Sequence, residues 1–164
     1  MSLNPGMMSS TTPEWGTPQA LFDELEAQYG PFTLDPCATH QNTKVPQNYF
    51  VEAEDGLSRK WTGRVFMNPP YGRRINRWVR KAYEEVAHGN ATLVVCLLPA
   101  RTDTAWWHDY CMRGDVTFIR GRVYFEQAGK SDRAPFPSAV VVFDSRVSAM
   151  TTEVLARYEE AADD

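Results

Sequence analysis

The chain has 164 residues, of which 43% are apolar and 12% aromatic, and its formal charge is -4. These values predict one globular domain, because disordered chains lack this apolar and aromatic content. No stretch approaches the roughly 18 apolar residues of a membrane-spanning helix, and the first residues lack the pattern of a signal peptide, so we expect neither. Three cysteines without a Cys-x-x-Cys pair exclude a disulfide scaffold and predict reduced thiols in a cytosol.

The charge is unevenly distributed along the chain. Residues 1–58 hold one base and eight acids, residues 59–101 nine bases and two acids, and residues 102–164 seven bases and eleven acids. The negative total argues against a protein that binds nucleic acid over a wide surface, for which a basic surface is expected. The basic central block is compatible with a local patch for nucleic acid, although a charge run is also typical of a solvated helix face.

The first third of the chain predicts one helix, one strand and a long loop. Thr-Pro at residues 17–18 is typical of an N-cap followed by proline in the first turn, and the helix runs to about residue 29, where Gly-Pro ends it. Residues 32–35 predict a short strand. Residues 36–63 show no sustained period, so we expect a long loop with at most one helical turn, which is typically a binding segment.

The central third predicts a strand, a helix and a second strand. Residues 64–68 form an apolar strand that ends at a proline pair. Apolar residues then recur at helical spacing from Arg73 to Val86, which predicts an amphipathic helix. The opposite face of this helix carries five bases: Arg73, Arg74, Arg77, Arg80 and Lys81. Residues 91–98 are continuously apolar, as expected of a central strand covered on both faces.

The last third predicts a helix at 103–112, a hairpin of strands 116–119 and 122–126, a polar loop at 127–137, a strand at 138–143 and a helix at 148–161. The dipeptide Arg120-Gly121 is the turn signal for the hairpin. Together the elements predict a compact α/β fold with a mainly parallel sheet and a C-terminal antiparallel hairpin. We expect residues 13–164 to form this single domain, after a disordered tail over residues 1–12.

The chemically most informative segment is Asn68-Pro69-Pro70-Tyr71, which lies where a strand ends and a helix follows. Ligands of open parallel sheets bind beyond the carboxyl ends of the strands. Two consecutive prolines fix the backbone and remove two N–H donors, so the segment presents carbonyl acceptors in a stiff shape. Asn68 adds a side-chain acceptor, and Tyr71 adds a flat ring for stacking.

Such an array is suited to holding the amino group of a planar base while an aromatic ring fixes the ring plane. With both amino hydrogens engaged, the nitrogen lone pair can turn towards an electrophilic methyl group, and no general base with a shifted pKa is needed. Catalysis then comes mostly from positioning, which contributes up to roughly 7 to 11 kcal/mol in well-oriented systems. The alternative interpretation is a rigid strand-to-helix turn, since proline pairs are common.

An ordered set of motifs resembles the phage DNA N-6-adenine-methyltransferases over about residues 13–145. The set comprises W-x-T-P at 15–18, L-D-P-C-A at 34–38, E-D-G-L at 54–57, W-x-G-R-V-F-M-N-P-P-Y at 61–71, L-L-P-A-R-T at 97–102 and G-R-V-Y-F at 121–125. The tetrapeptide alone is less specific, because it also occurs in methylases of glutamine amides. The resemblance implies a Rossmann-like fold that uses S-adenosylmethionine (AdoMet) to methylate the exocyclic amino group of adenine in DNA. It also implies a phage- or prophage-encoded protein in the cytoplasm of a bacterial host.

The resemblance also assigns roles to individual residues. The catalytic segment comprises Asn68, Pro69, Pro70 and Tyr71. The positions that match the cofactor site are Trp15, Thr17, Pro18, Asp35, Pro36, Asp55 and Asn68, with Asp35 at the methionine end of AdoMet and Asp55 at its adenine. One departure is that Asp-Pro-Cys-Ala at 35–38 replaces the glycine-rich F-x-G-x-G loop of larger amino-methyltransferases.

Several of these residues also have a purely structural interpretation. Asp35 can cap the turn before Pro36, Asp55 can open the turn at Gly56, and the Thr-Pro pair is explained as a helix start. Three tryptophans are expected in the core rather than in base stacking: Trp78, Trp106 and Trp107. His108 and Cys111 have ligand-like spacing, but a second pair is missing from the sequence, so we expect no metal.

The expected partner is DNA with a flipped adenine placed beside Tyr71, and no membrane. The DNA backbone should pass over bases near the catalytic segment: Arg73, Arg74, Arg77, Arg101, Arg122, Lys130 and Arg133. Residues 127–137 and 39–50 are the candidates for sequence recognition. Two alternatives stay open from the sequence: methylation of another amino nitrogen, in cytosine, RNA adenine or a protein glutamine, and a non-catalytic AdoMet or nucleic-acid binding module.

Overall fold

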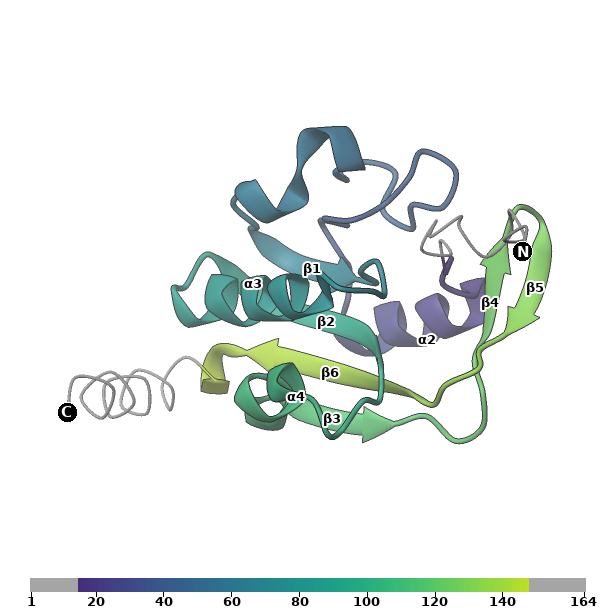
Figure 1. The fold of residues 1–164 in the computed structure, drawn as a ribbon. Helices are drawn as coiled ribbons and strands as arrows, with labels where there is room; N and C mark the ends of the chain where they lie inside the picture. Colours follow the sequence, from purple (N-terminus) through teal and green to yellow (C-terminus); the bar gives the residue numbers. More distant parts are fainter. Residues whose placement is uncertain (1–14, 148–164) are drawn as a thin grey trace, which may run out of the picture.

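The computed structural model describes residues 15–147 (Figure 1), so the predicted tail at 1–12 and the predicted helix at 148–161 lie outside the described residues. The helices are α2 (Gln19–Tyr29), η1 (Glu52–Glu54), η2 (Gly56–Ser58), α3 (Ile75–Ala87), α4 (Ala105–Asp109) and η3 (Cys111–Arg113). The strands are β1 (Gly63–Met67), β2 (Ala91–Pro99), β3 (Asp115–Phe118), β4 (Tyr124–Gln127), β5 (Lys130–Arg133) and β6 (Ser138–Asp144). The α/β class is confirmed.

The main sheet is mixed, which corrects the prediction of a mainly parallel sheet. Its strand order is β1-β2-β6-β3, and a separate hairpin pairs β4 with β5. The β1–β2 ladder is parallel, whereas β2–β6 and β6–β3 are antiparallel. The composition of an apolar strand does not indicate whether it pairs in a parallel or an antiparallel way. Strand β6 lies between β2 and β3 and is antiparallel to both.

Helices cover both faces of the main sheet. Phe66 of β1 packs on Phe22 of α2, with ring centroids 5.1 Å apart. Phe143 of β6 packs on Tyr83 of α3. Because the register aligns Phe66 with Val95 while Phe143 faces the preceding residue of β2, the two phenylalanines point to opposite faces. The sheet is therefore the middle layer between α2 on one side and α3 on the other (Figure 1).

The predicted strand at 32–35 is an extended segment alongside β1. Leu34 forms an isolated parallel bridge with Val65, and Asp35 forms another with Tyr49. This segment, β1 and β2 therefore run in the same direction. Asp35, Asn68 and Pro99 lie at the edge of the sheet where the carboxyl ends of these three segments are found. The site that this edge builds depends on this common direction.

Three predicted elements are wrong in detail. The strands at 116–119 and 122–126 do not pair: β3 joins β6, whereas β4, which overlaps the predicted strand 122–126, pairs with β5, which lies inside the segment predicted as a polar loop. The long loop at 36–63 holds two short 3-10 helices rather than at most one turn. The predicted helix at 103–112 is divided between α4, which Thr104 caps by accepting from the Trp107 N–H, and η3.

The start of α2 also differs from the prediction. Helix α2 begins at Gln19 after Pro18, and no side chain caps it. Thr17 is 3% exposed, and its hydroxyl accepts a hydrogen bond from the Asn68 side chain instead of capping the helix. The structural interpretation of Thr17 as an N-cap is therefore wrong, and the residue is available for a role in the site.

Candidate active site

A pocket of about 650 Å³ opens at the edge where β1 and the 32–35 segment end. Residues predicted to be catalytic and residues predicted to bind the cofactor both line it: Trp15, Thr17, Asp35, Pro36, Asp55, Asn68, Pro69 and Pro70. Pro18 and Tyr71 do not line it. The structure thus gathers most of the predicted residues around one cavity, from segments far apart in the sequence.

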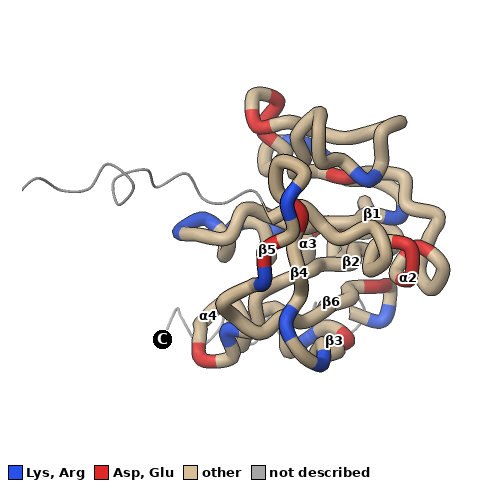
Figure 2. Tube along the Cα trace, turned by 90° about the vertical axis from the view of Figure 1, so that its right-hand side faces the viewer, with Lys and Arg blue, Asp and Glu red and all other residues tan. Residues whose placement is uncertain are grey.

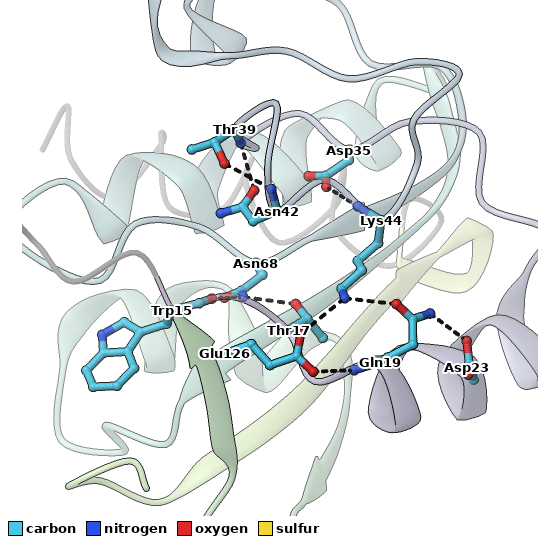
Figure 3. Close-up of polar contacts among 10 residues, drawn as sticks. All are labelled: Trp15, Thr17, Gln19, Asp23, Asp35, Thr39, Asn42, Lys44, Asn68 and Glu126. Carbon is cyan, nitrogen blue, oxygen red and sulfur yellow. Dashed lines mark hydrogen bonds and ion pairs between the residues drawn. The ribbon is translucent and has the colours of Figure 1, made fainter. Parts of the chain in front are cut away.

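The Asn68 side chain has one end engaged and the other free. Its Nδ2 donates to the Trp15 carbonyl at 2.5 Å and to the Thr17 hydroxyl at 3.0 Å (Figure 3). Its Oδ1 is buried and has no hydrogen-bond partner among residues 15–147. The Pro69 carbonyl also accepts no hydrogen bond from the part of the chain that the structure describes. The Oδ1 atom of Asn68 and the carbonyl of Pro69, both residues of the pocket wall, are therefore acceptors without a partner among residues 15–147.

Asp35 is a buried carboxylate in the same wall. It is 5% exposed and accepts weakly from the Lys44 backbone N–H and the Thr43 hydroxyl, each at 3.4 Å. Desolvation by burial raises the pKa of Asp35 to about 6 despite these bonds and the nearby Lys44 charge. A buried, poorly compensated carboxylate beside a cavity favours a cationic ligand group there.

Asp55 also lines the pocket and lies on a strained turn. Its φ of 50° is left-handed, and it joins η1 to η2. The following Gly56 has its Cα so close to the Pro36 carbonyl that a Cβ would lie 2.0 Å from that oxygen. Asp55 therefore forms the turn before Gly56, as its structural interpretation expects. The residue is exposed and also lines the pocket.

Lys44 is a pocket residue to which the sequence analysis gave no role. Its ammonium group donates to Gln19 Oε1 at 2.9 Å and lies 3.6 Å from Glu126 Oε2 (Figure 3). Glu126 in turn accepts from the Gln19 backbone N–H. The available signal was that Lys44 is the one base among the first 58 residues. Its interactions tie the long loop to α2 and to β4.

Tyr71 faces away from the large pocket and lines a second one of about 320 Å³. The residue is 7% exposed, its hydroxyl donates to the Leu97 carbonyl at 2.9 Å, and its ring packs edge-on against Phe125 and Phe136. Gly72 lines both pockets. The catalytic segment therefore forms the partition between two cavities, with Asn68 to Pro70 on one side and Tyr71 on the other.

The predicted DNA-binding bases are spread around these cavities. Arg74 lines the large pocket, Arg73 and Arg101 line the second one, and Arg77 is exposed on α3. Lys130 and Arg133 are exposed at the two ends of β5 (Figure 2). Arg122 differs, because it is half-buried with a buried Nη1 that lacks a partner among the described residues.

Residues 15–147 contain no cluster of three or more His, Cys, Asp or Glu side chains with the geometry to hold a metal ion. Within the same residues, no helix is long and apolar enough to cross a bilayer. The Nε2–H group of His108 donates to the Thr102 carbonyl at 2.7 Å, and Cys111 is buried.

The profile of the DNA N-6-adenine-methyltransferase (Dam) family matches residues 7–160, so the chain belongs to this family. It is 31% identical to the DNA N-6-adenine-methyltransferase of Haemophilus phage HP1 (strain HP1c1) over 140 residues, which cover 80% of this chain and 79% of the phage protein. A solved structure of Thermoplasma acidophilum 1320 is similar over 63% of this chain and 56% of that chain, with 17% identity and a TM-score of 0.33.

Membership of this family confirms the predicted activity. The protein is an enzyme that methylates the N6 amino group of adenine in DNA. A methyltransferase of this family takes its methyl group from AdoMet, and its substrate is DNA. The phage relative fits a protein encoded by a phage or prophage.

Proposed function

We propose that the 650 Å³ pocket binds AdoMet and that Asn68 and Pro69 hold the N6 amino group of a flipped adenine at its inner wall. The observation that carries this proposal is the free Asn68 Oδ1, because a buried acceptor without a partner is costly unless a ligand satisfies it. When bound, AdoMet supplies a methyl group on a positively charged sulfur. Everything else in the reaction is positioning by this chain.

The pocket residues fit the charges and shape of AdoMet. Asp35 offers a buried carboxylate to the cationic methionine end, which offsets the desolvation that raises the pKa of Asp35. Pro36 and Gly56 let two backbone segments approach closely, and Trp78 and Val51 give that end of the pocket an apolar wall for an adenine ring. Asp55 is then placed to accept a hydrogen bond from the adenine amino group of the cofactor.

The acceptor pair determines the chemistry at N6. Asn68 Oδ1 and the Pro69 carbonyl each accept one N6 hydrogen, so the nitrogen lone pair turns out of conjugation and towards the methyl group. As the N–C bond forms, the bond from the methyl group to the cofactor sulfur would break to leave a neutral thioether, and one N6 proton would pass to solvent. Neither residue needs to ionise, and the rate acceleration comes from orientation of the two reactants.

The base and its strand enter from the side of the second pocket. Tyr71 and Trp106 line this cavity together with Arg73 and Arg101, which is the combination of aromatic and cationic side chains that suits a nucleotide. An extruded adenine would stack near Tyr71 while the phosphates beside it contact the arginines. The exposed Lys130 and Arg133 extend this basic border along β5 (Figure 2).

The architecture supports a Rossmann-like methyltransferase fold of small size. The 32–35 segment, β1 and β2 run parallel, helices cover both faces, and the pocket lies beyond the carboxyl ends of these segments. In this proposal β6 and β3 extend the sheet without contributing to cofactor binding. The enzyme acts in the cytoplasm of the bacterial host, where both AdoMet and DNA are present.

Transfer of labelled methyl from AdoMet to DNA, followed by digestion to nucleosides, tests the proposal. We expect the label on N6-methyl-2′-deoxyadenosine from DNA that contains the recognition sequence. Duplex, single-stranded and RNA substrates are compared in parallel, with a glutamine-containing peptide as the protein control. Label on cytosine, on RNA alone or on the peptide would identify that group as the substrate in place of adenine in DNA. Absence of transfer to any DNA would contradict the proposal.

A further inference from the structure

The Asn68 amide is held by two neighbours that come from one short segment. The Trp15 carbonyl can only accept a hydrogen bond, so the amide end that faces it must be the NH₂ group. The Thr17 hydroxyl lies 3.0 Å from the same nitrogen. With both Nδ2 hydrogens directed at these two oxygens, Oδ1 is the atom left for a ligand.

The Trp15–Thr17 segment is itself held in place by β4. Gly16 and Glu126 exchange two backbone hydrogen bonds, of 2.9 and 2.8 Å. A Cβ on Gly16 would lie 2.4 Å from the Glu126 carbonyl oxygen, so only glycine permits this approach. Glu126 also accepts from the Gln19 N–H and pairs with Lys44 (Figure 3). Contacts with Glu126 of β4 thus hold the segment that positions Asn68.

We propose that Thr17 is a positioning residue for methyl transfer: the Trp15 carbonyl selects the amide orientation in which Oδ1 faces the adenine amino group, and the Thr17 hydroxyl, by accepting the second Nδ2 hydrogen, holds the amide plane in place. This inference rests on the proposed function of Asn68. It gives Thr17 a different role from the predicted contact with AdoMet. Thr17 acts through Asn68 and does not itself touch the reacting atoms.

The physical reason is the polarity of the substrate group. The adenine N6 group offers two N–H donors, which bind an oxygen and are repelled by an NH₂ group. A reversed Asn68 amide would place Nδ2 against N6 and Oδ1 against the Trp15 carbonyl, so both contacts would be unfavourable. Trp15 supplies one of the two acceptors through its backbone, and Thr17 is the one that a side-chain substitution can remove.

Thr17→Val tests the proposal, since valine keeps the shape of threonine and lacks the acceptor. We expect kcat for DNA methylation to fall about tenfold while the Kd for AdoMet changes less than about twofold. Thr17→Ser should restore most of the activity, because it restores the oxygen. In the background of Asn68→Ala, Thr17→Val should cause no additional loss. Thr117→Val, at an exposed position on β3, is the matched control and should match the wild type.

Nuclear magnetic resonance of the Asn68 side-chain NH₂ gives a readout that needs no turnover. In the free protein we expect two hydrogens protected from exchange, and loss of protection for one of them in Thr17→Val. The proposal is overturned by unchanged Asn68 signals, by weaker AdoMet binding with normal kcat, or by equal defects in the serine and valine variants. If Thr17→Val does not fold, Thr17→Ala and Thr17→Ser provide the same comparison. Failure of the wild type to methylate DNA would overturn the proposed function and leave the resonance test decisive for Thr17.

Discussion

Asp35 places a carboxyl group in a buried position where few hydrogen bonds offset the loss of solvation. Burial raises its pKa to about 6 from 3.8, so the native state binds a proton more tightly than the unfolded state between these values. The free energy of unfolding contributed by this group therefore decreases as the pH rises through that window. Such a destabilising group is typical of a binding site, and here the ligand that would benefit is the cationic end of AdoMet.

Replacement of Asp35 by asparagine should separate stability from binding. At pH 7 we expect Asp35→Asn to unfold with a free energy up to roughly 3 kcal/mol higher than the wild type, an advantage that disappears at pH 4. We expect AdoMet binding to become about 10- to 100-fold weaker, because a charge-assisted contact is lost. Urea unfolding at several pH values and calorimetric titration measure the two effects. A variant with the pH dependence and affinity of the wild type would refute the role of Asp35.

At the scale of the elements, the sequence predicted the position of Asn68 between a strand and a helix better than it predicted the hairpin. Asn68 was placed correctly because an apolar strand, a proline pair and an amphipathic helix follow each other without a gap. The hairpin was placed incorrectly because Arg120-Gly121 resembled a turn, whereas the true turn is Ala128-Gly129, with φ of 48° and 78°. Alanine rarely adopts a left-handed conformation, so no local signal marked this turn.

Contacts between segments that are distant in the sequence could not be predicted from local sequence patterns. The Thr17 hydroxyl serves Asn68, 51 residues away, instead of capping α2, and Glu126 pairs with Gly16 across most of the chain. Neither contact follows from periodicity or turn chemistry. The positions of the cofactor residues nevertheless agreed with the pocket because the motifs lie where the extended segments end at one edge of the sheet.

The segment that joins β1 to α3 should determine the salt dependence of DNA binding. Arg74 is exposed, lines the pocket and forms no ion pair within residues 15–147, so its charge is free to contact phosphate. We expect Arg74→Ala to lower the slope of log affinity against log salt concentration by about one. Arg146→Ala removes the same charge at the opposite end of the sheet, where Arg146 pairs with Asp115 and Asp144. Fluorescence anisotropy would refute this placement if both variants had the same slope.

At the scale of the whole molecule, the net charge of -4 is a poor guide to function. The nine bases of residues 59–101 include the arginines that border both pockets, whereas the acids of the first 58 residues include Asp35 and Asp55 in the pocket wall. Among the pocket-lining residues, the acids are thus confined to the wall of the large pocket, where Lys44 and Arg74 accompany them, whereas the second pocket is lined by Arg73 and Arg101 without an acid. This separation suits a cationic cofactor on one side and an anionic strand on the other.

The central claim is that the free acceptor of Asn68 receives the adenine amino group in the transition state. The most direct measurement compares Asn68→Ala with the wild type in single-turnover methyl transfer to DNA and in AdoMet binding. Asn90→Ala, immediately before β2 and outside the lining of both pockets, is the control. We expect the rate of methyl transfer to fall by about 10² to 10³ while the Kd for AdoMet stays within about threefold. Methyl transfer at the wild-type rate by Asn68→Ala, with label still on adenine N6, would contradict the claim.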